Sequence, residues 1–189
     1  MKNKLFISLL PLETDRLIIR KTNLEDVDML LKMDKQEITQ KYLGGIKNKT
    51  KEERIEFLEK KLKKFDSGLA GQLTVCLKDK TPIGLIGLSI DEDKNTGSVG
   101  YIFDYDYCNK GYCTEACKQL LDTGFNKLKL DKIFADTIDG NVSSIRVLEK
   151  LGFKLEGRRK KEAYLKEINE YRDFLDYRIL ISEYKKHKI

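Results

Sequence analysis

The sequence predicts a single α/β domain in which helices cover a mixed, mostly antiparallel sheet. Its 189 residues suit one domain with a full hydrophobic core. No internal repeat or Pro/Gly-rich linker divides the chain, so residues 1–189 are expected to form one unit. Strand-like and helix-like patterns follow in the order βααβββαβαββ, which is an antiparallel meander, a helix and then a β–α crossover.

The first part of this pattern is one strand followed by two helices. Residues 12–21 predict the strand, and Asn23 is placed to cap a helix with an apolar face. Thr50 and Glu53 have the spacing of a capping box, in which each side chain bonds the backbone amide of the other residue. The second helix is predicted to end at the Asp-Ser-Gly sequence of residues 66–68.

A meander and a third helix come next. Residues 72–77 and 83–90 predict a hairpin, and residues 98–103 predict a third strand after a turn rich in Asp, Asn and Gly. Apolar side chains recur at helical spacing over residues 114–128, which predicts a helix there.

The last part of the chain predicts a crossover and a closing hairpin. Residues 132–138 are expected to form a strand, and Asn141 can cap the short helix that follows. Gly152 is well placed as the left-handed C-terminal cap of that helix. Two further strands are expected near residues 154–164 and 171–181.

Composition limits the partners of the chain. A net charge of +6 suits a polyanionic ligand, although most lysines are expected on solvated surfaces. No aromatic-interleaved basic patch favours nucleic acid, and no apolar run approaches the roughly 20 residues of a membrane helix. The apolar N-terminus is short and interrupted by Ser8, so a cytoplasmic location is expected.

No metal site is expected. The cysteines at positions 76, 108, 113 and 117 form no CxxC pair, and the single histidine, His187, lies in the tail. In a cytoplasmic chain the cysteines are expected to be reduced thiols. Cys113 lies at a predicted helix start, where a thiol can have a lowered pKa and act as a nucleophile.

The segment from Cys108 to Ala116, CNKGYCTEA, is the most informative stretch. The first turn of a helix carries backbone N–H groups without intrahelical partners, at the positive end of the helix dipole. Gly111 lacks a Cβ and lets a phosphate approach such amides, and Lys110 adds positive charge. Taken alone, the segment fits either an anion-binding turn or an ordinary turn between a strand and a helix.

Three motifs together resemble the Gcn5-related N-acetyltransferase superfamily, in particular its branch of ribosomal-protein alanine N-acetyltransferases. The loop of that branch commonly reads WGKGYATEA. The segment from Asn141 to Phe153 has the family's N-x-x-S-x-x-x-x-x-x-L-G-F spacing, and Leu12 to Arg20 is close to its L-x-T-x-R-L-x-L-R opening. The three motifs occur in the family's order and span about residues 12–181, which is therefore the expected core of the domain.

The resemblance implies an acetyltransferase fold and acetyl-coenzyme A as the cosubstrate. The strand at residues 98–103 would splay from that at 132–138 and leave a V-shaped slot for the thioester. The loop backbone would hold the pyrophosphate, and the strand would pair with the pantetheine arm. The residues that the resemblance assigns to cofactor binding are Ile102, Phe103, Asn109, Lys110, Gly111, Tyr112, Cys113, Thr114, Asn141 and Ser144.

The resemblance also implies direct transfer of the acetyl group to an amine. A backbone N–H at Ile102 or Phe103 is expected to stabilise the oxyanion, and Ser144 to donate to the leaving thiolate. Ser144 can alternatively serve only as a backbone partner in the first helical turn. Relatives often carry Glu at the position of Ser98, so the general base is unassigned. The backbone of Cys113 would lie under the pyrophosphate, which argues against a covalent role for its thiol.

Two functions are compatible with these motifs. The first is an acetyl-coenzyme A-dependent N-acetyltransferase that acts on a protein N-terminus or on a small amine, such as a polyamine, amino acid or antibiotic. The second is a non-catalytic acyl-coenzyme A sensor, which the absence of Glu at Ser98 allows. The sequence contains no transferable code for the acceptor, and a monomer and a homodimer are both compatible with it.

Overall fold

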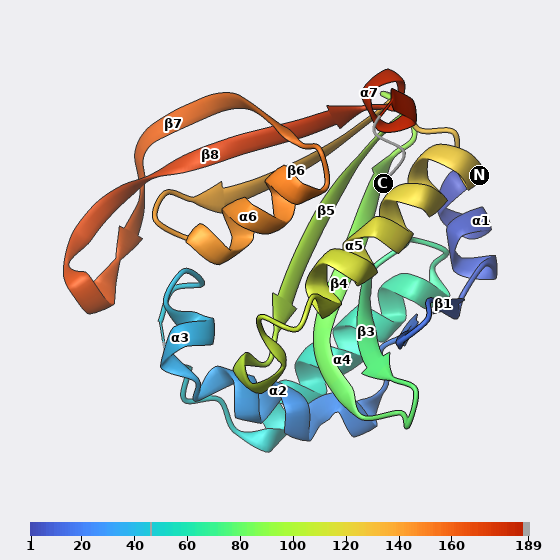
Figure 1. Ribbon diagram of the computed structural model, residues 1–189. Helices are drawn as coiled ribbons and strands as arrows, with labels where there is room; N and C mark the ends of the chain where they lie inside the picture. Colours follow the sequence, from blue (N-terminus) through green and yellow to red (C-terminus); the bar gives the residue numbers. More distant parts are fainter. Residues whose placement is uncertain (46, 187–189) are drawn as a thin grey trace.

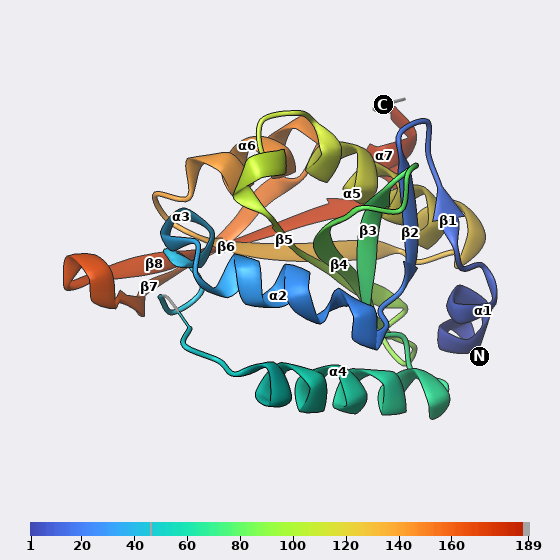
Figure 2. The ribbon, with the colours of Figure 1, turned by 90° about the horizontal axis from the view of Figure 1, so that it is seen from below.

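The computed structural model describes residues 1–45 and 47–186, in which an eight-stranded sheet lies between two groups of helices (Figures 1 and 2). His187 lies outside the described residues. The strands are β1 (Leu12–Glu13), β2 (Leu17–Lys21), β3 (Gln72–Leu77), β4 (Pro82–Asp91), β5 (Thr96–Phe103), β6 (Lys132–Ile138), β7 (Lys154–Leu165) and β8 (Glu170–Leu180). The α-helices are α1 (Lys2–Ser8), α2 (Val27–Asp34), α3 (Glu37–Gln40), α4 (Lys51–Asp66), α5 (Tyr112–Asp122), α6 (Val142–Lys150) and α7 (Ile181–Lys186). Short helical turns are η1 (Leu24–Asp26), η2 (Tyr105–Tyr107), η3 (Thr123–Lys127) and η4 (Lys166–Ile168).

The sheet has the strand order β1-β2-β3-β4-β5-β6-β8-β7. All neighbouring strands are antiparallel except β5 and β6, which are parallel. These two pair only where residues 96–98 lie opposite residues 132–134. Beyond that point they diverge, as Figure 1 shows. The predicted mixed sheet with splayed central strands is therefore confirmed.

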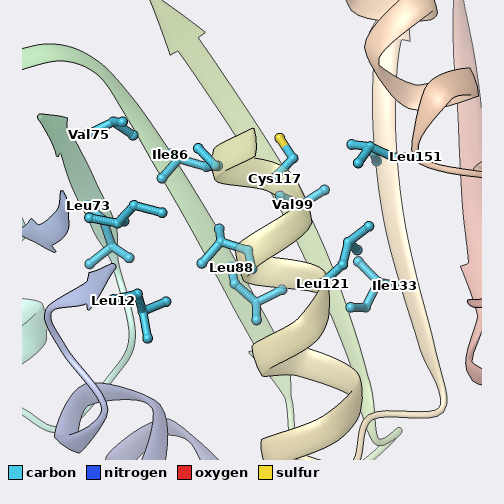
Figure 3. Close-up of a cluster of buried hydrophobic side chains, with 14 of the residues drawn as sticks. Leu12, Leu73, Val75, Ile86, Leu88, Val99, Cys117, Leu121, Ile133 and Leu151 are labelled. Carbon is cyan, nitrogen blue, oxygen red and sulfur yellow. The ribbon is translucent and has the colours of Figure 1, made fainter. Parts of the chain in front are cut away.

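Helices cover both faces of the sheet. Figure 2 shows α5 and α6 on one face and α2 and α4 on the other. Under α5 lies the main core, which includes Leu88, Val99, Leu121 and Ile133 (Figure 3). A second cluster packs α2 and α4 against Leu85 of β4. Because successive strand residues point to opposite faces, Leu85 and Leu88 of the same strand belong to different clusters.

The N-terminal segment differs from prediction. The single strand expected at residues 12–21 is two strands, because Thr14 and Leu17 close a turn between them. The Leu17 amide donates to Thr14 Oγ1, and the Thr14 amide donates to Leu17 O, both at 3.0 Å. Helix α1 was not expected, since its seven residues are too few for a clear period. Its Phe6 is fully buried in the main core.

The helix expected at residues 114–128 also has different bounds. It begins at Tyr112, and its α-helical part ends at Asp122. One π-helical turn follows, in which the Leu128 amide donates to Thr123 O at 2.9 Å. Helices α3 and α7 are further elements that the sequence patterns did not predict. Within the described ranges, no helix has both the length and the apolar character needed to cross a membrane.

Three of the four predicted helix caps are confirmed, whereas Asn23 precedes the η1 turn and α2 has Asp26 as its N-cap. The Glu53 amide donates to Thr50 Oγ1 at 3.2 Å, and the Thr50 amide donates to Glu53 Oε2 at 2.9 Å. The Ser144 amide donates to Asn141 Oδ1 at 3.3 Å, which starts α6. Gly152 follows that helix with a φ of +83°, in the left-handed region that suits glycine.

A buried polar network joins α2 to the sheet. Asp26 is only 1% exposed and accepts hydrogen bonds from two nitrogens of the Arg20 guanidinium, at 3.0 and 2.7 Å. It also accepts from Thr74 Oγ1 at 2.7 Å and from the Asn23 amide at 2.9 Å. The hydrogen bond with Asp26 raises the pKa of Arg20, although burial opposes this effect. The network therefore holds a charged pair between β2, β3 and the start of α2.

Replacing Asp26→Ala is expected to lower the free energy of unfolding by about 3 kcal/mol, because it leaves the Arg20 charge without its partner. Urea denaturation followed by circular dichroism measures this loss. Asp28→Ala is the matched control, since the Asp28 side chain is 78% exposed and its ion pair with Lys51 spans 3.3 Å. That control should change the free energy by less than about 0.5 kcal/mol. Equal losses in the two variants would contradict the assignment.

Candidate active site

A pocket of about 600 Å³ opens where β5 ends and α5 begins, beside the separation of β5 and β6. We call it the α5 pocket. The segment after α3, the loop before α5 and the start of α6 form its other walls. The predicted contact residues that line it are Ile102, Phe103, Asn109, Gly111, Tyr112, Cys113, Thr114, Asn141 and Ser144. The fold thus brings the predicted set together with the exception of Lys110.

The loop before α5 directs backbone amides toward this pocket. Asn109 and Gly111 have left-handed φ values of +60° and +80°. Gly111 is the N-cap of α5, and the Glu115 amide donates to Gly111 O at 3.0 Å. The amides of residues 112–114 precede that bond and have no partner further back in the helix. They form the positive end of an eleven-residue helix at the pocket wall.

The cations around the α5 pocket differ from the expectation. Lys110 Nζ donates to Asp106 O at 2.9 Å and lies 5.3 Å from the centre of the Tyr107 ring, so its side chain holds the loop instead of lining the pocket. Arg146 and Lys150 of α6 line the pocket. Sequence analysis missed both, although their spacing of four residues on one predicted helix was a usable signal.

An ion pair from the β1–β2 turn fixes the loop from outside. Glu115 Oε1 accepts from Thr14 Oγ1 at 2.6 Å and from the Arg16 amide at 3.0 Å, and Glu115 Oε2 accepts from Arg16 Nε at 2.6 Å. The Arg16 guanidinium also donates to Lys110 O at 3.0 Å and lies 4.6 Å from the centre of the Tyr112 ring. Burial raises the pKa of Glu115, but the hydrogen bonds from Thr14 and Arg16 outweigh burial and lower it.

Two hydroxyl groups meet inside the pocket. Tyr101 Oη and Ser144 Oγ are 2.9 Å apart, and either can donate. Burial raises the pKa of Tyr101 well above its ordinary value, so the phenol stays protonated at neutral pH. The side chain of Asn141 caps α6 and accepts from Ser143 Oγ at 2.9 Å. Sequence patterns did not predict this contact, because the alternation of a strand does not reveal a partner on a helix elsewhere in the chain.

The thiol of Cys113 is not activated. A hydrogen bond with Cys117, one helical turn further on, and burial both raise the pKa of Cys113. Cys117 is fully buried in the main core. A thiol that stays protonated is a poor nucleophile, which argues against a covalent intermediate on Cys113.

A second pocket of about 540 Å³ is lined by residues of α2, α4, β4 and β5. We call it the α4 pocket. Helices α2 and α4 cover the face of the sheet opposite α5 (Figure 2). Leu43, Tyr101 and Ile102 line both pockets, so the two meet where β5 and β6 have separated. Ser98 and Asp136 also line the α4 pocket, from β5 and β6 respectively. A molecule in the α5 pocket and another in the α4 pocket can therefore approach each other through the sheet.

The hydrogen-bonding direction of the β5 backbone changes which amide of this strand can stabilise the oxyanion. The Asp104 amide donates to Ile83 O at 3.0 Å, and Ile102 is paired with Leu85 two residues earlier in the same antiparallel register. Successive residues of such a ladder point their N–H groups alternately toward and away from the partner strand. The Ile102 amide therefore faces β4 and is not directed at the gap. The amides of Tyr101 and Phe103 face the gap, and Ile102 contributes its side chain.

Comparisons with known proteins identify the family to which this fold belongs. A model of the acetyltransferase (GNAT) domain family matches residues 16–154. The uncharacterised N-acetyltransferase YnaD of Bacillus subtilis is 32% identical over 173 residues, covering 90% of this chain and 97% of that protein.

Solved structures of acetyltransferases have the same fold as this chain. An acetyltransferase of the GNAT family from Bacillus anthracis is 31% identical and superimposes with a TM-score of 0.78, covering 90% of this chain and 98% of that one. RimL, a ribosomal L7/L12 α-N-protein acetyltransferase solved with coenzyme A, is 18% identical, with a TM-score of 0.79 and coverage of 92% and 98%. At that identity the likeness to RimL shows the fold alone. This chain belongs to the GNAT acetyltransferase family, as its three motifs predicted.

Replacing Glu115→Gln is expected to accelerate amide hydrogen exchange several-fold over residues 108–112, because the neutral amide holds Arg16 less firmly. Mass spectrometry of exchanged peptides measures the rates. Because the folded pKa of Glu115 is lowered, its contribution is complete at neutral pH and is lost as the pH falls through that folded pKa. Glu149→Gln, an exposed change on α6, should leave the exchange of residues 108–112 unaltered. Unchanged exchange in the Glu115 variant would show that the ion pair does not fix the loop.

Proposed function

We propose that this chain transfers the acetyl group of acetyl-coenzyme A directly to a primary amine, with the cofactor in the α5 pocket and the amine in the α4 pocket. The observation that carries the proposal is that two pockets on opposite faces meet at Leu43, Tyr101 and Ile102, beside the start of α5. A cytoplasmic location belongs to the same proposal and is supported by cysteines present as free thiols.

The α5 pocket offers complementary groups along the length of coenzyme A. The amides of residues 112–114 would bind the pyrophosphate, and Gly111 lets it approach because no Cβ intervenes. Arg146 and Lys150 supply positive charge on the facing helix. The pantetheine amides would pair with the free edge of β5, where the N–H groups of Tyr101 and Phe103 face the gap.

The reaction requires three events at the junction of the pockets. The amine must lose a proton, attack the thioester carbonyl and form a tetrahedral intermediate, which then releases the thiolate. The amide of Tyr101 or Phe103 would stabilise the oxyanion, since both point into the gap. Ser144 Oγ would donate a hydrogen bond to the leaving sulfur, and the phenol of Tyr101, 2.9 Å from Ser144 Oγ, would in turn donate to Ser144.

Coenzyme A binding by Gly111→Val should be at least about tenfold weaker than by the parent chain, because a β-branched residue is strained at a φ of +80° and the turn must change. Isothermal calorimetry measures the dissociation constant, and circular dichroism checks the fold. Gly157→Val is the matched control in β7, where a Cβ meets Asp176 only at ordinary contact distance, 3.6 Å. Unaltered affinity in a folded Gly111 variant would remove the loop from the cofactor site.

Ser144→Ala is expected to lower kcat by about 10- to 100-fold with little change in KM for acetyl-coenzyme A, because the hydrogen bond to the leaving thiolate in the transition state is lost. Thiol release with a broad panel of amines and N-terminal peptides measures both constants. Ser143→Ala, one residue away, should retain kcat. A non-catalytic sensor would bind coenzyme A yet release no thiol with any amine, which is the outcome opposed to the enzyme proposal.

A further inference from the structure

The α4 pocket has a cationic wall. Arg54, Lys61 and Lys64 lie on the face of α4 that lines the pocket, at spacings of seven and three residues, and Lys47 lines it from the preceding segment. Residues at these spacings share one side of a helix. Lys63, in the same stretch of sequence, does not line the pocket. The positive charges are therefore gathered on the pocket side of this part of α4.

One of these charges is neutralised within the protein. Arg54 Nε donates to Asp34 Oδ2 at 2.5 Å, and the Arg54 guanidinium makes a second contact with the other oxygen of the same carboxylate. Both side chains are largely buried, with 13% and 3% of their surfaces exposed. This pair joins α2 to α4 and uses the charge of Arg54. Its role in the pocket is structural.

The other three ammonium groups are available to a ligand. Among the residues that the structure describes, no carboxylate lies within 4.0 Å of the ammonium of Lys47, Lys61 or Lys64. Lys47 is half-buried, and burial lowers its pKa; the charge of Asp34 opposes this effect and that of Arg54 adds to it. An ammonium group removed from water without a partner gains free energy when a carboxylate arrives.

The remaining carboxylate of the pocket does not balance these charges. Asp136 of β6 lines the pocket, and its side chain is 52% exposed and 3.9 Å from the guanidinium of Arg159. With Asp34 paired to Arg54, three free lysines face one carboxylate that already has a cation nearby. A polyamine would add positive charge to this wall, whereas an acid would complement it.

We propose that the acceptor amine of this enzyme carries carboxylate groups close to the amine, and that Lys47, Lys61 and Lys64 select it. The proposal rests on the acetyltransferase function proposed above. Lys61 and Lys64 are three residues apart on α4, about 4.5 Å along the helix axis, and Lys47 lines the same pocket from the segment before α4. An acidic peptide N-terminus carries several carboxylates that can complement these separate ammonium groups, whereas a free acidic amino acid carries only two.

The test compares acceptors that differ only in charge. Thiol release is measured with a peptide that has Glu at positions two to five, with the same peptide carrying Gln at those positions, with free glutamate and with spermidine. We expect kcat/KM for the Glu peptide to exceed that for the Gln peptide by at least about tenfold at low ionic strength. If glutamate reacts as well as the Glu peptide, the carboxylates of a single residue are sufficient for selection, whereas a clear preference for the peptide assigns selection to several lysines of the wall.

Lysine variants test whether the preference for the Glu peptide arises from the cationic wall. Lys47→Gln and the double change Lys61→Gln with Lys64→Gln should each lower kcat/KM for the Glu peptide several-fold and leave the Gln peptide within about twofold. Lys63→Gln is the matched control and should alter neither value. A loss that is equal for both peptides would indicate a structural defect and would overturn the role of these lysines.

Two results would overturn selection of acidic acceptors, and both can be told apart from a failure of the proposed acetyltransferase function. The Gln peptide or spermidine reacting as fast as the Glu peptide would reject acid selection in a working acetyltransferase. Absence of turnover with both acidic acceptors, in a chain that binds coenzyme A by calorimetry, would also reject it. Failure of calorimetry to detect coenzyme A binding would instead overturn the proposed function itself.

Discussion

The separation of β5 from β6 is the constraint on which the site depends. Strand β6 pairs with β8 along all of residues 132–138, but with β5 only at residues 132–134. It therefore follows β8 and leaves one edge of β5 without a strand partner. Backbone N–H and C=O groups need partners when they are removed from water. The open edge is thus suited to a ligand that carries its own amides, and both pockets meet beside it.

Residues distant in sequence hold the loop before α5 beside the gap between β5 and β6. Asn109 adopts a left-handed backbone conformation, which asparagine tolerates better than most residues, and contacts from elsewhere in the chain fix the loop around it. Arg16 supplies such contacts through Lys110 O and Glu115, across about half the length of the chain. Thr14 and Arg16 belong to the family's opening motif, and the sequence alone did not reveal the structural role of that motif. Their contacts show that the opening motif and the loop motif form one structural unit.

Local chemistry made much of the fold predictable, and long-range contacts set its limit. The Thr50–Glu53 box, the Asn141 cap and Gly152 each depend on residues within a few positions, and all three are present as predicted. Helix α1 was missed, because its stability derives from Phe6 in a core assembled by other elements. The pairing of Tyr101 with Ser144 was missed for the same reason, since their neighbouring positions arise only from the crossover between β5 and α6.

Strand β5 shows how far a sequence motif can specify chemistry. Alternation along the strand predicts that Ser98 and Ile102 share one face, and both do line the α4 pocket. It does not predict which amides face the gap, because that depends on the register with β4. The register turns Ile102 N–H toward β4 and leaves those of Tyr101 and Phe103 free. Tyr101 then contributes a backbone donor at the gap and a phenol in the α5 pocket, so one residue links the cofactor side to the reacting centre.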